Sequence, residues 1–536
     1  MCYQKRVCVL YCAIVAAASV LLARLFCLSI PESNRSLEVL EGQYTGRVDV
    51  CERTGFIYDR NGYVISHKAD GYVALVNPLE CSDILGSAAS LSQASAAAQM
   101  SEIYERIIEG VPFTLSLTSD LPERVKGVYV FRKYEQNNEI AKHFLGYSNS
   151  DGKGVSGIRR AYNTLLCGEL YSKVSARFDT NAKRESLSGF ILDTQKYLSD
   201  DGIVTTIDRD LQFFCDGLSQ EIPSGAVVVA NIKTGEILSM SSYPEYDAQN
   251  IEKVLDSDKG ELLNRAVMSF TPGSVFKIVV AAAALEKNEE LYDLEYVCEG
   301  SIEVDGNVFR CHKHDGHGKI DMKTAFAESC NTYFVNLGKE IGIEQIIETA
   351  RKLELDVPTK ADFVQEGINY FIDENNHSSG YLANISFGQG NLCLSPIDMT
   401  RVVGAASTGY LAELKTVKGQ MKDGSFEMKN PVKKTRIFSE NTCKRLKEMM
   451  KMCVSDGTGK AGGIYGVNTG GKTATAQTGR FNTDGVEYVH KWFCGVYPIE
   501  NPRISVCVLC DDVTAENVSP AVVFAKICSY LNEKDL

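Results

Sequence analysis

Thr271-Pro272-Gly273-Ser274-Val275-Phe276-Lys277 is the stretch of sequence that decides the fold. Residues 275–286 are apolar and rich in alanine, so a loop is expected to enter a helix at Ser274. Ser274 and Lys277 are three positions apart and would share one face of that helix. The pattern predicts a serine nucleophile whose proton is taken by a lysine, and it requires that burial or neighbouring cations lower the lysine pKa.

The sequence on both sides of this stretch predicts an α+β domain. A hairpin is expected from a buried-strand run at 225–232, the turn Lys233-Thr234-Gly235 and a returning strand at 236–241. Further helices are expected after Asp321 to near Cys330, over 396–406 and over 439–454, and strands over 467–477, 488–497 and 503–510. With a closing helix, these elements imply an antiparallel sheet flanked by helices whose first and last strands are neighbours.

Two further motifs strengthen the interpretation of Ser274, because S-x-x-K alone also fits an N-cap serine followed by a surface lysine. They are Ser329-Cys330-Asn331 and Lys472-Thr473, which follows Gly470-Gly471. Together the three resemble the S-x-x-K, S-x-N and K-T-G motifs of penicillin-binding proteins and serine β-lactamases. The flanking residues resemble, more specifically, the transpeptidase domain of class B penicillin-binding proteins: Asn264-Arg265-Ala266, Pro272-Gly273, His317-Gly318, Thr332-Tyr333-Phe334, Gly388-Gln389-Gly390, Ser395-Pro396 and His490-Lys491-Trp492-Phe493.

The resemblance extends upstream of the catalytic motifs. Residues 55–62 and 152–157, and Thr206-Ile207-Asp208 with Leu211-Gln212, are similar to the pedestal of this class and its junction with the catalytic domain. Residues 53–66 predict two strands joined at Asn61-Gly62, and residues 87–100 predict a helix. We place a β-rich pedestal or dimerisation-type domain at 31–200 and the transpeptidase domain at 201–536.

The resemblance implies a peptidoglycan D,D-transpeptidase that cross-links stem peptides during cell-wall synthesis. Ser274 would attack the carbonyl of the penultimate D-alanine of a stem peptide ending in D-Ala-D-Ala, and Lys277 would remove the serine proton. Ser329 and Asn331 would pass the proton to the departing D-alanine and hold the peptide. β-Lactams would acylate the same serine, an amine from a neighbouring strand would resolve the acyl-enzyme, and no cofactor is expected.

The same resemblance assigns the substrate-binding groups. Lys472 and Thr473 would bind the terminal carboxylate of the stem peptide. The backbone N–H groups of Ser274 and Thr475 would form an oxyanion hole, in which a single donor contributes about 3–4 kcal/mol. No metal is assigned to this site.

The amino terminus predicts a membrane anchor. After Lys5 and Arg6 an uncharged run covers 7–23, and Arg24 is followed by the apolar residues 25–30, so a helix over 7–30 is long enough to span a bilayer. A cleaved signal peptide is the alternative. The positive-inside rule places residues 1–6 in the cytoplasm and the chain after about Pro31 outside the cell membrane. A membrane glycosyltransferase is the expected partner.

Composition excludes a general polyanion-binding role. The chain has 56 basic and 69 acidic residues among 536 and a net charge of -13, whereas binding to a phosphate backbone requires clustered Lys and Arg. Nucleic acid is therefore not an expected partner.

Two motifs have a competing interpretation that we reject. Lys233-Thr234-Gly235 spells K-T-G, but it precedes the nucleophile and is expected at the tip of the hairpin. Residues 466–473 match the phosphate-binding pattern G-x-x-x-x-G-K-T, which requires a hydrophobic strand before it and a helix after it. Here Gly462-Gly463 precedes and a strand-like segment follows, so nucleotide binding is not expected.

Two departures from the class motivate other functions. Ala474 replaces the glycine of the third motif, and its methyl could crowd the site or be absorbed. Arg159 stands where the class usually has glutamate. A catalytically weak penicillin-binding scaffold of a cell-wall synthesis complex is thus the alternative, followed by a β-lactam sensor or β-lactamase. A bifunctional glycosyltransferase is disfavoured because about 170 pedestal residues are few for a second enzyme.

A group of soft ligands precedes the second motif. Cys298, Cys311, His312, His314 and His317 lie within twenty residues, which raises the possibility of a zinc clip. A Cys298–Cys311 disulfide is the strongest expectation for an exported protein, free thiols come second, and the zinc clip ranks last.

Overall fold

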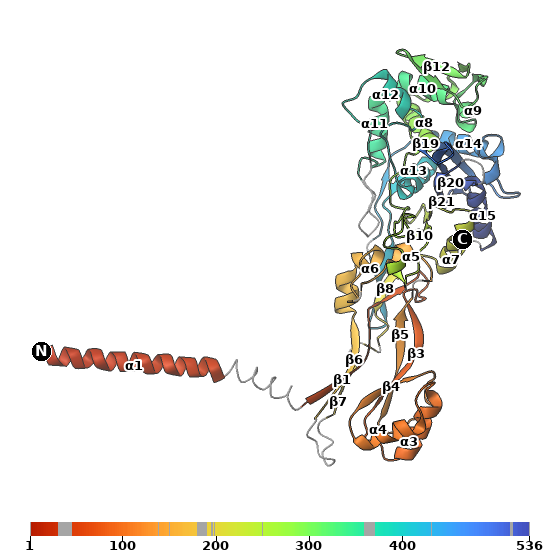
Figure 1. The fold of residues 1–536 in the computed structure, drawn as a ribbon. Helices are drawn as coiled ribbons and strands as arrows, with labels where there is room; N and C mark the ends of the chain where they lie inside the picture. The colour runs from red at the N-terminus through yellow and green to blue at the C-terminus, as the bar shows by residue number, and fades with distance from the viewer. Residues whose placement is uncertain are drawn as a thin grey trace. The chain divides into compact units, whose positions relative to one another are not determined.

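The computed structural model describes residues 2–29, 45–137, 139–149, 151–179, 190–194, 197, 199–248, 250–357, 370–429, 431–514 and 518–534. The chain divides into two compact units (Figure 1). The first unit comprises Met1–Arg53, Ala69–Glu135 and Tyr171–Leu198, and the second comprises Thr54–Lys68, Gln136–Leu170 and Ser199–Leu536.

The amino-terminal segment is helical, as α1 (Cys2–Ser29). Among the residues described, no helix combines the length and the apolar character needed to cross a membrane. Residues 30–44, where the pedestal was predicted to begin, lie outside the described residues. The membrane span expected at 7–30 stays a prediction.

The first unit contains two small three-stranded sheets. In one, β6 (Ser172–Asp179) lies between β1 (Thr45–Arg53) and β7 (Ile191–Asp193), and in the other β3 (His67–Val76) lies between β4 (Phe113–Leu117) and β5 (Val128–Gln136). Two helices, α3 (Ile84–Ala94) and α4 (Met100–Glu109), pack their apolar residues into a common core with the second sheet. The single helix predicted at 87–100 is wrong, because Ser95 ends α3 and its hydroxyl accepts from the N–H groups of Ala97 and Ala98.

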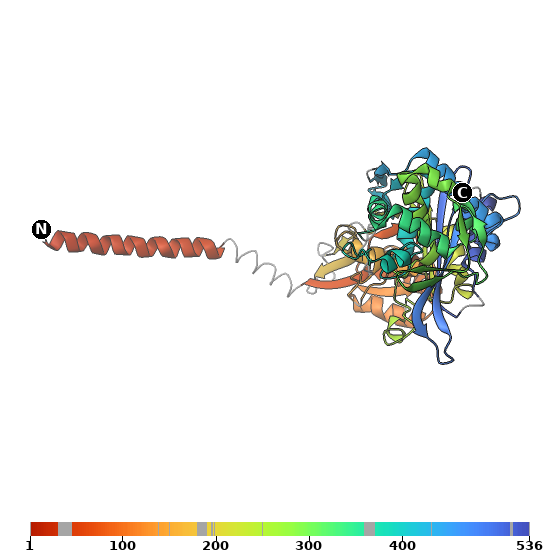
Figure 2. The same ribbon diagram turned by 90° about the horizontal axis from the view of Figure 1, so that it is seen from above.

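The main sheet of the second unit has the strand order β10 (Ile237–Tyr243), β9 (Gly225–Asn231), β21 (Ile504–Val513), β20 (Glu487–Tyr497) and β19 (Gly470–Phe481), with every pair antiparallel. The pairing of β9 with β21 confirms that the first and last predicted strands are neighbours. Figures 1 and 2 show the long blue strands of this sheet flanked by helices.

Successive side chains of a strand point to opposite faces of the sheet. In this sheet both faces carry buried apolar side chains, and helices pack against each face. Cys507 and Leu509 of β21 share a core with α8 (Lys277–Lys287), α13 (Pro396–Thr408) and α14 (Glu440–Ser455). Val506 and Val508 share the other core with α7 (Arg209–Asp216) and α15 (Pro520–Glu533). The predicted α+β architecture of this domain is thus confirmed.

Each unit comprises separate stretches of the chain that alternate with those of the other unit. The sequence, by contrast, predicted one domain boundary at residue 200. A second sheet has the order β17 (Ser425–Met428), β16 (Val417–Lys422), β8 (Gly202–Thr205) and β2 (Phe56–Tyr58), and β2 runs parallel to β8. This pairing ties residues near 56 to the second unit. Arg159, in α6 (Gly157–Ala161), also belongs to the second unit, where it is buried and donates to the carbonyl of Ser66 at 3.1 Å.

The second unit contains further described elements. The helices are α5 (Lys142–Leu145), α9 (Met322–Ala327), α10 (Asn331–Ile341), α11 (Ile343–Lys352) and α12 (Ser379–Ile385). The strands are β11 (Tyr296–Cys298), β12 (Ser301–Val304), β13 (Asn307–Arg310), β14 (Gly318–Ile320), β15 (Tyr410–Ala412) and β18 (Lys434–Arg436). A π-helical turn covers Leu165–Glu169, and 3₁₀ turns cover Gly217–Gln220, Ile251–Lys253, Gly273–Phe276, Glu289–Asp293 and Lys460–Gly462.

Both rejected motifs have the predicted conformations. Lys233-Thr234-Gly235 forms the turn between β9 and β10, where the side chain of Asn231 accepts from the backbone N–H groups of Lys233 and Thr234. Lys472 of the G-x-x-x-x-G-K-T pattern lies inside strand β19 rather than at the start of a helix. The second pattern therefore lacks the helix amino terminus that a phosphate site needs.

Candidate active site

Ser274 lies in a 3₁₀ turn, Gly273–Phe276, that leads directly into α8. Two hydrogen bonds hold this turn in place: Gly273 N–H donates to the carbonyl of Gly388 at 2.9 Å, and the side chain of Trp492, on β20, donates through Nε1 to the carbonyl of Thr271 at 3.1 Å. Gly273 has φ of 56°, and a Cβ there would lie 3.1 Å from Ala476 Cβ, so the close approach to the strand requires glycine. The predicted loop-to-helix position of Ser274 is confirmed.

Lys277 is fully buried behind the serine. Its Nζ donates to the carbonyl of Ser329 at 2.8 Å and to Asn331 Oδ1 at 2.8 Å, and it lies 3.4 Å from Ser329 Oγ. Burial, and then the charge of Lys472, hold the pKa of Lys277 well below its ordinary value. Within the described ranges, the hydrogen bonds of Lys277 run to the second motif and not to Ser274 Oγ.

Ser329 and Asn331 are placed by the junction of two helices. Helix α9 ends at Ala327, Ser329 adopts φ of 57°, and α10 begins at Asn331. A left-handed conformation is unfavourable for a serine and persists only when surrounding contacts hold it. The bond from Lys277 Nζ to the Ser329 carbonyl is one such contact, so the nucleophile helix and the second motif hold each other in place.

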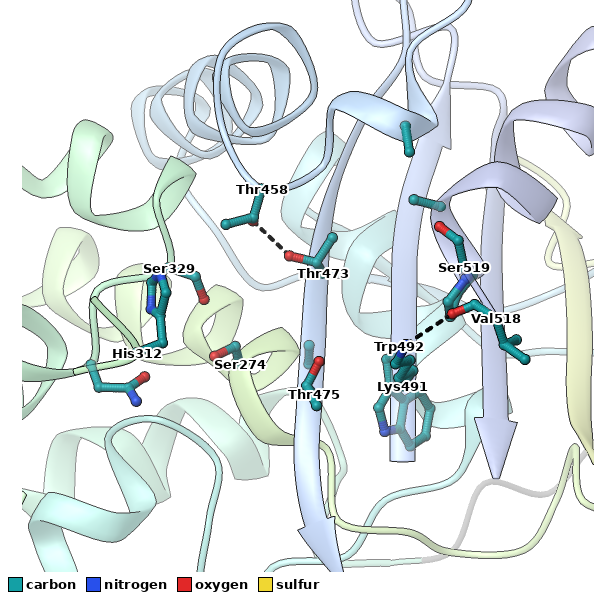
Figure 3. A pocket seen from close by; sticks show the side chains of 15 residues that line it. Ser274, His312, Ser329, Thr458, Thr473, Thr475, Lys491, Trp492, Val518 and Ser519 are labelled. Atoms are coloured by element: carbon teal, nitrogen blue, oxygen red, sulfur yellow. Dashed lines mark hydrogen bonds between the residues drawn. The ribbon is translucent and has the colours of Figure 1, made fainter. Parts of the chain in front are cut away.

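The third motif lies on β19. Lys472 is fully buried, its Nζ donates to the carbonyl of Thr473 at 3.0 Å, and burial lowers its pKa. The Thr473 hydroxyl lies 2.7 Å from the hydroxyl of Thr458, as the dashed line in Figure 3 marks. In the strand order of this sheet β19 comes last, so one of its edges is not paired with another described strand of that sheet.

A pocket of about 480 Å³ joins the three motifs. Figure 3 shows Ser274 and Ser329 on one side and Thr473 and Thr475 on strand β19 opposite them. Of the predicted site residues, Ser274, Ser329, Asn331, Thr473 and Thr475 line this pocket. Lys277 and Lys472 lie behind its wall, where they can influence charge and hydrogen bonding in the pocket.

The sequence reasoning missed other residues that line the pocket. Thr458 follows α14, Lys491 lies on β20 and donates to the carbonyl of Val518 at 3.1 Å, and Ser519 precedes α15. Of these three residues, only Lys491 lies in a stretch, His490-Lys491-Trp492-Phe493, whose sequence was identified as similar to the transpeptidase domain. The other two occur in segments without a distinctive motif, and only the fold brings them to the pocket.

Ala474 does not show the crowding considered from the sequence. Its side chain is 6% exposed and belongs to the core that includes Trp492. A Cβ built on Gly273 would lie 3.5 Å from Ala474 Cβ, which is an ordinary contact distance, and the real glycine has no Cβ. The methyl of Ala474 is therefore accommodated opposite a glycine.

Comparisons with known proteins relate this chain to one family. Residues 225–529 match the family described as penicillin binding protein transpeptidase domain. Stage V sporulation protein D of Bacillus subtilis is 29% identical over 512 residues, which cover 85% of this chain and 74% of that protein. The peptidoglycan D,D-transpeptidase FtsI of Buchnera aphidicola subsp. Schizaphis graminum is 24% identical, over 76% of this chain and 70% of that protein.

The fold is also found among solved structures. Penicillin binding protein 3 from Mycobacterium tuberculosis, complexed with aztreonam, matches with a TM-score of 0.66 and 22% identity, covering 91% of this chain and 97% of that chain. Because the family match spans more than half of the sequence, this chain belongs to the penicillin-binding protein transpeptidase family. The resemblance to class B penicillin-binding proteins is confirmed.

Proposed function

We propose that this chain is a peptidoglycan D,D-transpeptidase that acts through an acyl-enzyme on Ser274 and is acylated at the same residue by β-lactams. The observation that carries the proposal is the convergence of the three motifs on one pocket, with the buried Lys277 behind it. Family membership supports the reaction class.

Lys277 suits the role of general base. Because its pKa is held well below the ordinary value, a larger fraction of Lys277 is the neutral amine than for an exposed lysine at the same pH, and the neutral amine can accept a proton. Ser274 Oγ would give up its proton as it bonds to the carbonyl carbon of the penultimate D-alanine. The C–N bond to the terminal D-alanine then breaks, and its amine leaves with the proton, which Lys277 can relay through the Ser329 hydroxyl 3.4 Å away.

The strand side suits substrate binding. Thr473 and Thr475 present hydroxyl groups to the pocket, and the buried Lys472 supplies positive charge close to Thr473, so the terminal carboxylate of a stem peptide would bind there. The last position of β19 in its sheet favours an extended peptide that adds alongside it. The backbone N–H groups of Ser274 and Thr475 would stabilise the oxyanion.

Deacylation determines whether the product is a cross-link. An amine of a second stem peptide attacks the acyl carbon, the C–O bond to Ser274 breaks, and the serine recovers a proton from the attacking amine. The pocket opens to the surface between the two walls, which gives an acceptor strand access. The alternative of a catalytically weak scaffold loses support because the Ala474 methyl lies opposite Gly273, where even an added Cβ would stay at an ordinary contact distance.

We also propose that the chain acts at the outer face of the cell membrane, with residues 1–6 in the cytoplasm and residues 7–30 as its anchor. The support is the uncharged run 7–23 after Lys5 and Arg6. The first unit would serve as the pedestal, and a membrane glycosyltransferase would supply the glycan strands that the enzyme cross-links. A fusion of a reporter to each end of the chain, tested for access to protease in intact cells, checks this topology.

Stem-peptide turnover by the full-length protein tests the reaction. Mass spectrometry should detect release of D-alanine from a peptide ending in D-Ala-D-Ala and, when an acceptor amine is supplied, a cross-linked product. Covalent penicillin binding without any D-alanine release from natural stem peptides would favour the scaffold instead. Rapid hydrolysis of the penicilloyl-enzyme would favour a β-lactamase.

A further inference from the structure

Three cysteines and one histidine form a compact group beside the second motif. The Sγ atoms of Cys298, Cys311 and Cys330 and one ring nitrogen of His317 all lie within 4.8 Å of one another. The three cysteines are at most 1% exposed. Sequence spacing alone pointed to the first two cysteines and three histidines, and it did not include Cys330.

The local fold brings these residues together from separate segments. Cys298 ends β11 and pairs with Gly318 of β14, which places it next to His317. Cys311 follows β13, and its N–H donates to the carbonyl of Gly300 at 2.8 Å. Cys330 lies between α9 and α10. His312 and His314 are exposed and are not part of the group.

The distances within the group fit a tetrahedral metal site. With a Zn–S distance of about 2.3 Å and a Zn–N distance of about 2.0 Å, tetrahedral geometry puts two sulfurs about 3.8 Å apart and a sulfur and a nitrogen about 3.5 Å apart. Here Cys311 Sγ lies 3.8 Å from Cys330 Sγ. Cys298 Sγ and Cys311 Sγ each lie 3.5 Å from His317 Nδ1.

We propose that Cys298, Cys311, Cys330 and His317 bind one zinc ion in a structural site. Three thiolates and an imidazole are a donor set that selects zinc, and four protein ligands leave no open position for catalysis. The disulfide between Cys298 and Cys311 expected from the sequence is not formed, since both are free cysteines in the structure.

Neighbouring polar groups support the thiolates. The Thr332 hydroxyl donates to Cys298 Sγ at 3.1 Å, and the backbone N–H of Tyr333 donates to Cys330 Sγ at 3.5 Å. Such second contacts orient metal ligands and spread their negative charge. The opposite nitrogen of His317, Nε2, is buried and has no hydrogen-bond partner among the described residues, so the imidazole is the least supported ligand.

The site would brace the catalytic motif. Cys330 separates Ser329 from Asn331, so a metal bond to its sulfur fixes the chain between two predicted catalytic residues. It would help to hold the left-handed conformation of Ser329, which has φ of 57°. The zinc ion would also fix Cys311, whose neighbour Arg310 accepts a hydrogen bond from Asn331 Nδ2 at 3.3 Å. Zinc binding and the geometry of the active site would thus be coupled.

Metal content of the full-length protein tests the proposal. Protein purified under reducing conditions with zinc in the growth medium should contain about one zinc ion per chain by plasma mass spectrometry. Cys311→Ser and Cys330→Ser should lose nearly all of it, and His317→Gln should bind zinc more weakly. Cys443→Ser is the matched control, because Cys443 is also a buried free cysteine but lies on α14, outside the group.

Cobalt substitution of the unaltered protein provides a second readout if a cysteine variant fails to fold. Cobalt(II) bound by thiolates in a tetrahedral site gives intense visible absorption and a sulfur-to-metal charge-transfer band, and added zinc should remove both. A chain without zinc and without these cobalt bands would overturn the proposal. So would zinc that stays at full occupancy in Cys311→Ser, or a disulfide mapped to any of the three cysteines in protein isolated without oxidation.

Discussion

The two walls of the pocket hold their functional groups in different ways. On the helix wall, the segment that carries Ser274 and Lys277 is far in sequence from Ser329, and hydrogen bonds from Lys277 Nζ to the carbonyl and hydroxyl of Ser329 connect the two segments. On the strand wall, Lys472, Thr473 and Thr475 are close in sequence, and the register of β19 with β20 places them. The helix wall therefore depends on a few long-range polar contacts, whereas the strand wall depends on a sheet.

This difference separates two kinds of function. Burial in the helix wall, and then the charge of Lys472, lower the pKa of Lys277, which suits a group that takes up a proton. The strand wall offers hydroxyl groups and an edge of β19 that no other described strand of its sheet pairs with, which suit binding of an extended peptide. We therefore expect substitutions on the helix wall to reduce rate and substitutions on the strand wall to reduce affinity.

Loss of the nucleophile should have the largest effect. Ser274→Ala should abolish covalent labelling by a fluorescent penicillin, because it removes the hydroxyl proposed to form the acyl bond. Gel fluorescence of the purified protein measures this, with Ser425→Ala, an exposed serine of β17, as the control. Persistent labelling of a folded Ser274→Ala protein would show that the helix wall does not carry the nucleophile.

Loss of the base should come next. Lys277→Met fills a similar buried volume without an amine, and we expect the acylation rate to fall by about 10²–10⁴, the usual contribution of a general base. Stopped-flow labelling with a penicillin gives the rate. Lys339→Met, at an exposed position of α10, should leave it unchanged. A fall of less than threefold in Lys277→Met would exclude Lys277 as the base.

The pH profile of acylation tests the same lysine without mutation. Since its pKa is held well below the ordinary value, Lys277 should become neutral at a pH well below that at which an exposed lysine does, and above that point the rate should be level. Below that lowered pKa the amine becomes protonated, and the rate should fall about tenfold for each further pH unit. A rate that keeps rising to about pH 10 would mean that Lys277 titrates like an exposed lysine.

On the strand wall, removal of Lys472 should affect binding. Lys472→Met should raise the penicillin concentration needed for half-maximal acylation by about 10–100-fold, because a hydrogen bond to a charged group contributes about 1.5–3 kcal/mol. The limiting acylation rate should change much less. Concentration-dependent labelling separates the two parameters. An unchanged half-maximal concentration with a strongly reduced limiting rate would place Lys472 with the catalytic groups.

Ala474→Gly should have the smallest effect. Removal of the buried methyl and the added freedom of glycine should lower the free energy of unfolding by roughly 1–2 kcal/mol, with the acylation rate nearly unchanged. Urea denaturation followed by tryptophan fluorescence suits this test, because Trp492 pairs with Ala474 across the sheet. An acylation rate that increases several-fold would restore the crowding hypothesis raised by the sequence.

Local pattern predicted the elements that carry the motifs. The hairpin β9–β10, the turn at Lys233, the loop before α8 and the last three strands were all expected, because alternation of apolar residues and turn-forming residues act over a few positions. The helix expected at 87–100 is interrupted because the Ser95 hydroxyl bonds to nearby backbone, which a count of helix-forming residues does not detect.

The sequence by itself determined the class of the protein, the order of its motifs and the identity of the pocket residues that those motifs contain. Only the tertiary structure decided that Lys277 contacts Ser329 and Asn331, and that Cys330 meets Cys298, Cys311 and His317. Residue patterns report interactions between positions close in the chain. The pKa of a buried lysine and the assembly of a four-ligand site depend on segments that meet only when the chain has packed.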